Sequence, residues 1–178
     1  MALEHALLVA LSEQPAAGLE LSRRFSRSIG YFWGATHQQI YRVLGRMDAD
    51  GWVEVTEVPQ RGRPARKVYA VSPAGEQALA AWLAEPTPAQ PLRSDLAVKL
   101  RGASFGDRGA VLDVVRAALA DHHARLAHYE HLRTRDYPAD PTVLTGLELD
   151  QYLVLRGGIL LERGWVDWLT EYLEAHPS

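Results

Sequence analysis

The hydrophobic residues of the first fifty positions recur at the spacing of helices. Apolar residues at i, i+3, i+4, i+7 and i+8 predict an amphipathic helix over residues 3–11. Leu21, Phe25 and Ile29 form the apolar side of a second helix, and a third extends from about 36 to 49. Three short helices therefore open the chain.

The third predicted helix has two chemically distinct sides. Its inner stripe consists of Ile40, Val43, Leu44 and Met47. Its N-terminal end and outer side carry hydrogen-bonding residues: Thr36, His37, Gln38, Gln39, Tyr41 and Arg42. Asp50 and Gly51 are expected to stop the helix.

After residue 51 the hydrophobic period changes from helical to extended. Two segments rich in β-branched residues, 52–58 and 67–71, predict strands, and the stretch 59–66 between them predicts a loop longer than a two-residue hairpin turn. Ser72 and Pro73 then suit the N-cap and first position of a fourth helix. The order of three helices, strand, loop, strand and helix is that of a winged helix.

The rest of the chain is helical in pattern. Helices are expected from Ser94 to about 102, over 107–135 and over 141–175. Helices of this length in a half of under about 90 residues need a partner surface, and a second copy of the chain is the simplest one. We therefore predict a mostly α fold with a small β-hairpin, divided as follows: an N-terminal winged helix-turn-helix domain at 1–85, a proline-marked linker at 86–93, and a helical dimerisation arm at 94–178.

Composition narrows the function classes without changing this architecture. The 178-residue chain has no cysteine, so neither a disulfide nor a Cys-ligated zinc is expected. No apolar run approaches the ~18 residues that indicate a membrane span, so we expect a cytoplasmic protein with no membrane partner. A net charge of −3 excludes a globally basic nucleic-acid binder. The stretch from Pro59 to Ala74, however, contains four basic residues and no acidic one.

Those four residues, Arg61, Arg63, Arg66 and Lys67, suit contacts with the DNA backbone or minor groove. The major groove admits one helix, and Gln39 could bond both N6 and N7 of an adenine there, so Gln39→Ala is expected to relax base preference. Either feature alone is commonly just a solvated surface. Their joint occurrence in winged-helix order predicts that the third helix and the wing bind a double-stranded operator.

Several stretches also resemble a known family. The run from Gly30 to Leu44 looks like the recognition region of PadR-family transcriptional regulators, and the run from Gly62 to Gly75 resembles their wing and following helix. Asp95 to Leu100 and Leu155 to Gly158 are similar to the longer-tailed subgroup. The resemblance implies a homodimer joined by C-terminal helices that represses a nearby operon until a small, often phenolic or drug-like effector releases it.

An aromatic cluster allows two interpretations. Trp165, Trp168 and Tyr172 are spaced i, i+3 and i+7, which places them on one helix face. They could pack in a core or a dimer interface, or they could form a wall that stacks a planar aromatic effector, with Trp33 contributing to either. Gly157 and Gly158 in the same helix predict a kink or a close backbone approach.

The remaining polar residues give no site for catalysis or metal binding. Four histidines share the long predicted helix, but no cysteine or paired carboxylate completes a metal site: His122, His123, His128 and His131. His122 lies on the apolar stripe, where a hydrogen-bonded interface residue is expected. We expect no enzyme and no cofactor, because no nucleophile or phosphate-binding motif is recognisable. The alternatives are a protein-interaction or drug-sequestering helical module without specific DNA binding, and an enzyme of unrecognised type.

Overall fold

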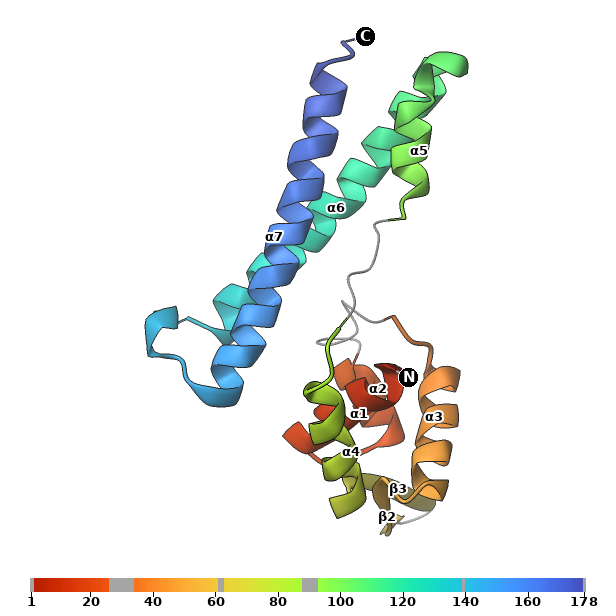
Figure 1. The fold of residues 1–178 in the computed structure, drawn as a ribbon, viewed down its shortest axis with the longest axis vertical. Coiled ribbons are helices and arrows are strands. Elements are labelled where there is room, and N and C mark those ends of the chain that lie inside the picture. The colour runs from red at the N-terminus through yellow and green to blue at the C-terminus, as the bar shows by residue number, and fades with distance from the viewer. Residues whose placement is uncertain (1, 26–33, 61–62, 88–92, 139, 178) are drawn as a thin grey trace. The chain divides into compact units, whose positions relative to one another are not determined.

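The computed structural model describes residues 2–25, 34–60, 63–87, 93–138 and 140–177, and it divides into two compact units, 1–89 and 90–178 (Figure 1). Most described residues are helical, and a small antiparallel sheet lies in the first unit. The predicted fold class is confirmed.

The first unit combines short helices with one sheet. Its elements in chain order are α1 (Ala2–Glu13), β1 (Ala16–Ala17), α2 (Gly18–Phe25), α3 (His37–Ala49), β2 (Val53–Gln60), β3 (Arg63–Val71) and α4 (Pro73–Leu83). The strands lie in the order β1-β3-β2, each pair antiparallel. One core joins these elements, and its largest fully buried side chains come from α1, α2 and α3: Leu7, Leu8, Leu11, Leu21, Phe25, Ile40, Leu44 and Met47. The described residues of the periodic stripes predicted for these helices thus face a common interior, and Ile29 of the second stripe lies outside the described residues.

The end of α3 is set by Gly51, whose φ of +70° is a left-handed conformation that suits glycine. Beyond it, the backbone N–H of Trp52 donates to the Met47 carbonyl at 2.8 Å, and that of Gly51 donates to Asp48 at 3.1 Å. This pairing satisfies the last carbonyls of the helix. The chain enters β2 directly afterwards, so the turn fixes the strand relative to α3.

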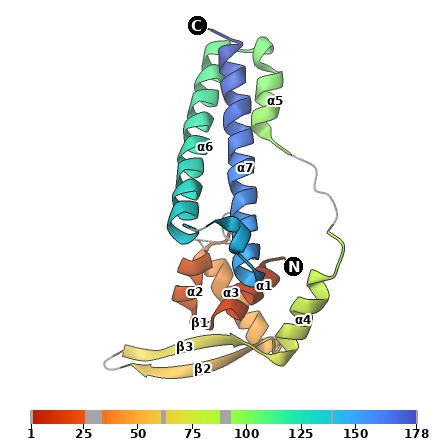
Figure 2. The ribbon, with the colours of Figure 1, turned by 90° about the vertical axis from the view of Figure 1, so that its left-hand side faces the viewer.

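The wing, which is formed by β2 and β3, has longer strands than the sequence predicted. We expected a loop over 59–66, whereas β2 continues to Gln60 and β3 begins at Arg63 (Figure 2). The register shifts between Val58 and Gln60, where Pro59 has no N–H for the ladder. The two strands therefore pair further than the sequence predicted on either side of residues 61–62, which lie outside the described residues.

The second unit is built on two long helices that lie side by side in both views (Figures 1 and 2). Its elements are α5 (Asp95–Arg101), the 3₁₀ turn η2 (Ala103–Phe105), α6 (Arg108–Asp136), the 3₁₀ turn η3 (Pro141–Val143) and α7 (Gly146–Glu174). Leu100, Val115 and Leu169 are buried together where α5, α6 and α7 meet. Among the described residues, no helix has the length and apolarity needed to cross a membrane.

The expected start of the last helix was wrong. We expected it to begin at Pro141 with Asp140 as N-cap, but Asp140 caps η3 instead, and α7 begins at Gly146. The Asp140 carboxylate accepts from the Thr142 N–H at 2.9 Å, which lowers the pKa of that carboxyl. The helix runs uninterrupted through Gly157 and Gly158, and Gly158 is buried in it. The kink or close backbone approach expected at these glycines stays a prediction.

Candidate nucleic-acid interface

The third helix separates its apolar and polar residues as the sequence predicts. Ile40, Val43, Leu44 and Met47 are each 2% exposed or less, whereas His37, Gln38, Gln39 and Arg42 are exposed. The four buried side chains anchor the helix in the core of the first unit. The hydrogen-bonding side is thereby held towards solvent.

The first turn of α3 is stabilised by a reciprocal cap. The Thr36 hydroxyl accepts from the Gln39 backbone N–H at 3.2 Å, and the Thr36 N–H donates to Gln39 Oε1 at 2.8 Å. This is a capping box, in which both side chains satisfy free backbone donors. Gln39 is therefore engaged within the helix, and Gln38 beside it is the stronger candidate for reading a base.

Tyr41 packs back onto the start of α2. A Cβ built on Gly18 would lie 2.5 Å from Tyr41 Cε1, so the glycine leaves room for the phenol ring. The ring is nevertheless 47% exposed. Arg46, one turn beyond Arg42, pairs with Glu4 of α1 at 2.7 Å and so links α3 to α1. The outer side of α3 thus contains solvent-exposed residues and also residues that contact α1 and α2.

The structure describes the side chains of only two of the four basic residues predicted for the wing. Arg66 and Lys67 are exposed on β3, opposite Val58 and Glu57 of β2. Arg63 opens β3, but its side chain, like the whole of Arg61, lies outside what the structure describes. The predicted basic character of the wing therefore rests, in the described part, on Arg66 and Lys67.

An open cleft beside the wing contains charged residues that the sequence alone did not assign to DNA. We call it the α2 cleft; it measures about 570 Å³ and is lined by Ala17, Leu19, Glu20, Arg23, Arg24 and Arg66. Arg66 Nη1 lies 3.7 Å from Glu20 Oε2 across it. Arg24 also donates to the Gln14 carbonyl at 2.6 Å. The sequence does not show that these residues lie together, because they meet only through the pairing of β1 with β3. That pairing brings the start of α2 next to the wing.

The aromatic residues of α7 belong largely to the core of the second unit. Trp165 and Tyr172 pack against the buried cluster around Leu169, and the Tyr172 hydroxyl donates to the Leu100 carbonyl at 3.3 Å. Trp168 is 38% exposed, with its ring 5.2 Å from that of Trp165. Trp33 lies outside the described residues. Of the four candidates for an aromatic wall, Trp168 is the one that the described structure leaves on the surface.

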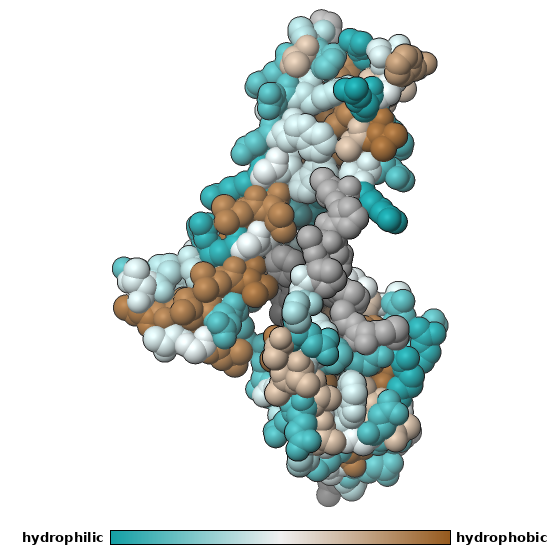
Figure 3. All heavy atoms as spheres, in the orientation of Figure 1, coloured by the Kyte–Doolittle hydropathy of each residue, from teal (hydrophilic) through white to brown (hydrophobic). Residues whose placement is uncertain are grey.

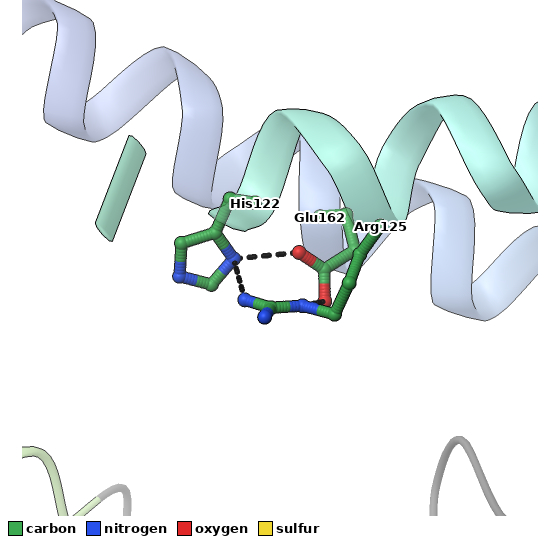
Figure 4. A network of polar contacts seen from close by, with 3 residues as sticks. All are labelled: His122, Arg125 and Glu162. Carbon is green, nitrogen blue, oxygen red and sulfur yellow. Dashed lines mark hydrogen bonds and ion pairs between the residues drawn. The ribbon is translucent and has the colours of Figure 1, made fainter. Parts of the chain in front are cut away.

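His122 takes part in a polar network between α6 and α7 (Figure 4). Its Nδ1 lies 2.6 Å from Glu162 Oε2, and Arg125 Nε donates to the other carboxylate oxygen at 3.1 Å. The imidazole also stacks on Trp165, with 4.9 Å between ring centroids. Its partners are thus within its own chain. In the part of the chain that the structure describes, no group of three or more His, Cys, Asp or Glu could hold a metal ion.

A winged helix with a solvent-facing polar third helix, followed by a separate helical unit, is an arrangement typical of DNA-binding transcriptional regulators. Residues 7–81 match the model of the transcriptional regulator PadR-like family, and residues 92–176 match a model described as virulence activator alpha C-term. The chain belongs to the PadR-like family, as its sequence resemblance indicated.

Relatives cover almost the whole chain. A probable transcriptional regulator of Mycobacterium tuberculosis is 51% identical over 98% of this chain and 97% of its own. The structure of the Vibrio cholerae virulence activator AphA is 32% identical, with a TM-score of 0.80 over 97% of this chain and 96% of that one. Bacillus subtilis PadR in complex with operator DNA has the same fold: 23% identity and a TM-score of 0.83 over 96% and 97% of the two chains. The protein is accordingly a transcriptional regulator.

Proposed function

We propose that this regulator is a homodimeric, sequence-specific DNA-binding repressor released by a small aromatic effector. The observation that carries the proposal is the division of α3, which buries four apolar side chains and exposes a run of hydrogen-bonding residues at its N-terminal end. A recognition helix meets base edges with its N-terminal residues. The Bacillus subtilis relative bound to operator DNA has the same fold.

In this proposal the DNA-contacting surface is made of α3 and the wing. Gln38 and Arg42 reach base edges or phosphates, and His37 and Tyr41 flank them. Arg66 and Lys67, with Arg61 and Arg63 beyond the described side chains, contact the backbone beside the groove. We assign this role to the domain at 1–85, and dimerisation and effector binding to 94–178, with 86–93 as the linker.

The surface of α7 supports a second copy of the chain as its partner. Four of its apolar residues recur every seventh position and are exposed by 38–61%: Leu147, Val154, Leu161 and Trp168. Two more, Leu153 and Leu160, are exposed beside them, and Figure 3 shows apolar side chains gathered over the lower part of this helix. A seven-residue apolar repeat is the pattern by which helices pair. Such a pair would bring two recognition helices into one molecule, as a pseudo-palindromic operator requires.

We base the proposed direction of regulation, which is repression, on a Bacillus subtilis relative. That relative is a negative transcriptional regulator, 27% identical over 96% of this chain. Since another relative is an activator, a reporter gene behind the DNA upstream of this protein's gene tests the sign. Repression predicts more reporter signal when the regulator is deleted. Less signal on deletion would make it an activator.

We propose that the effector shifts the equilibrium from dimers that can bind DNA to dimers that cannot. Bacillus subtilis PadR has been solved with p-coumaric acid, and we propose that a phenolic or similarly planar compound binds this chain, with Trp168 as the exposed aromatic contact. An inducer must bind the DNA-incompetent dimer more tightly. Titration of p-coumaric acid should release DNA; equal affinity for p-coumaric acid with and without DNA would exclude it as an inducer.

The experiment for DNA binding is a fluorescence anisotropy titration. One labelled duplex carries the region upstream of this protein's own gene, and a second has the same length and a random sequence. The proposal predicts tighter binding to the first and, for both, a linear fall of log affinity with log salt concentration. No binding to either duplex at low salt would instead favour a helical interaction or sequestering module.

A further inference from the structure

We propose that Glu4 is a positioning residue for base reading: through its ion pair with Arg46 it sets the orientation of α3, and with it the preference of the regulator for one DNA sequence over another. The inference rests on the DNA-binding function proposed above. It gives α1, a helix outside the proposed contact surface, a role in specificity. It also excludes Arg46 from the arginines that contact phosphate.

The ion pair joins a nearly buried acid to a half-exposed base. Glu4 Oε1 lies 2.7 Å from Arg46 Nη2, with the Glu4 side chain 12% exposed and the Arg46 side chain 47% exposed. A charged hydrogen bond of this length is stronger than one between neutral groups. Because the carboxylate is largely removed from water, loss of its partner would leave a buried charge without compensation. The guanidinium of Arg46 is therefore engaged with α1.

The direction of this contact matters because apolar packing supplies little of it. Apolar side chains of α1 and α3 lie in one core, among them Leu7, Leu11, Leu44 and Met47. Hydrophobic burial is non-directional, so it holds two helices together and does little to fix their rotation. A hydrogen bond depends on angle as well as on distance. The contact between Glu4 and Arg46 therefore adds a directional constraint between the two helices.

The first turn of α1 is a firm support for this constraint. His5, the residue after Glu4, is 7% exposed, and its ring stacks on that of Trp82 in α4, with 4.5 Å between centroids and 7° between planes. The ring of Trp52, just before β2, lies 5.7 Å from that of His5. The first turn of α1 is thus packed against α4 and the entry to β2, while Glu4 extends from it to α3.

Arg46 lies on the same side of α3 as the proposed base-reading residues. Gln38, Arg42 and Arg46 are each four positions apart, so they form one ridge of the helix, and all three are exposed. At a rise of about 1.5 Å per residue, Gln38 and Arg46 are about 12 Å apart along the axis, and a tilt of about 5° at Arg46 moves Gln38 by about 1 Å. Side chains of a recognition site must be held within about 0.5 Å. A loosened ion pair therefore costs base contacts before phosphate contacts.

The test measures the ratio of the affinities for the upstream and random duplexes in the full-length chain. Glu4→Gln keeps the shape of the side chain and removes its charge. It should lower the affinity for the upstream duplex roughly three- to tenfold. It should leave the affinity for the random duplex and the slope of log affinity against log salt unchanged. Glu85→Gln, exposed two residues after α4, is the control for the same change of net charge.

Arg46→Gln distinguishes positioning from contact with phosphate. It should lower the same ratio by a similar factor, and the double variant should be no worse than either single one, because both remove one interaction. Arg101→Gln on α5, also exposed, is the control for the lost positive charge. If Arg46 contacts phosphate, Arg46→Gln will weaken binding to both duplexes and flatten the salt slope by about 0.9. That result would overturn the assignment.

Thermal unfolding of each variant shows whether the protein is folded at the assay temperature, and Arg46→Gln alone decides the matter if Glu4→Gln is unfolded. A purely structural role of the pair would lower the unfolding temperature and leave the ratio of affinities unchanged. If the wild type prefers the upstream duplex and the folded variants keep that preference, the inference fails and the proposed function stands. If the wild type has no such preference, both fail.

Discussion

Gln38 and Gln39 are neighbours of the same residue type, but they have different roles in this protein. Gln39 accepts from the Thr36 N–H and closes the first turn of α3, while Gln38 is exposed one position earlier. The spacing Thr-x-x-Gln is itself the signature of a capping box and could have been read from the sequence. The side-chain oxygen of Gln39 accepts from the Thr36 N–H, so we expect Gln38 rather than Gln39 to read a base.

We therefore expect the two alanine variants to separate. Gln38→Ala should reduce the preference for the upstream duplex over the random one and leave stability unchanged. Gln39→Ala should lower the free energy of unfolding by about 0.5–1 kcal/mol, because the Thr36 N–H loses its partner. Urea unfolding and anisotropy on both variants measure this. The reverse assignment would be correct if Gln39→Ala alone changed base preference.

A second residue-scale prediction concerns Tyr69, which is 8% exposed between β1 and β2. Burial, followed by the nearby Asp48 and Tyr41, raises the pKa of its hydroxyl above the ordinary 10.0. The folded state therefore keeps this proton to higher pH than the unfolded chain does. Its contribution to stability is complete below about pH 10 and is lost as pH rises through the folded pKa.

Tyr69→Phe should accordingly flatten the alkaline fall of the free energy of unfolding, which urea titrations at a series of pH values up to about 11 can follow. Tyr152→Phe on α7 is the control for the loss of one tyrosine hydroxyl. An alkaline fall of the same steepness in Tyr69→Phe and wild type would refute this account of Tyr69.

At the scale of elements, the junction between β2 and α4 depends on close backbone approach. A Cβ on Gly75 would overlap the Trp52 carbonyl oxygen, and the Ser72 hydroxyl donates to the Gly51 carbonyl at 2.5 Å. Gly45, within α3, is different, since nothing lies within 4 Å of the position its Cβ would take.

Gly75→Ala should therefore cost about 1–3 kcal/mol of stability, because backbone atoms must move to admit the methyl group. Gly45→Ala should increase stability by about 0.5–1 kcal/mol, since glycine disfavours a helix interior. Chemical unfolding of both variants decides the matter. Equal effects of the two alanines would show that the backbone does not approach Gly75 this closely in solution.

The elements differ in how far their sequence predicts them. Helix α3 was predictable, because its apolar spacing and the Asp50-Gly51 stop agree. Strand β1 was not, since two alanines are too short to show a period and only their pairing with Tyr69 and Val68 defines them. Leu83 lies four residues after Leu79, which packs against the core, but Leu83 is the last residue of α4 and is 63% exposed. Periodicity thus locates long elements, while pairing and termini depend on tertiary contacts.

At the scale of the whole molecule, the proposed activity requires two copies of the chain. The second unit buries a small cluster around Val115 and Leu169. The apolar residues of α7 that recur at every seventh position remain exposed to solvent. The length of the predicted helices indicated this need for a partner, but the partition of the aromatic residues was not predictable. Trp165 and Trp168 are three residues apart, and only the packing of α5 and α6 on α7 decides which one is covered.

Leu161→Glu, in the middle of that stripe, should convert the dimer to a monomer and weaken DNA binding at least tenfold, since a charge would be buried between two apolar faces. His123→Glu, exposed on α6, serves as the control for an added acid. Sedimentation equilibrium of both variants gives the masses. A dimer that persists in Leu161→Glu would place the interface elsewhere.

The most direct test of the account is a hydroxyl-radical footprint of the wild-type protein on the duplex from upstream of its own gene. Two recognition helices in one dimer predict two patches of backbone protection, related by symmetry and centred about 10 base pairs, or a multiple of that, apart. The protection should disappear when random DNA is substituted at the same protein concentration. A single unsymmetrical patch, or equal protection of both duplexes, would contradict sequence-specific binding by a dimer.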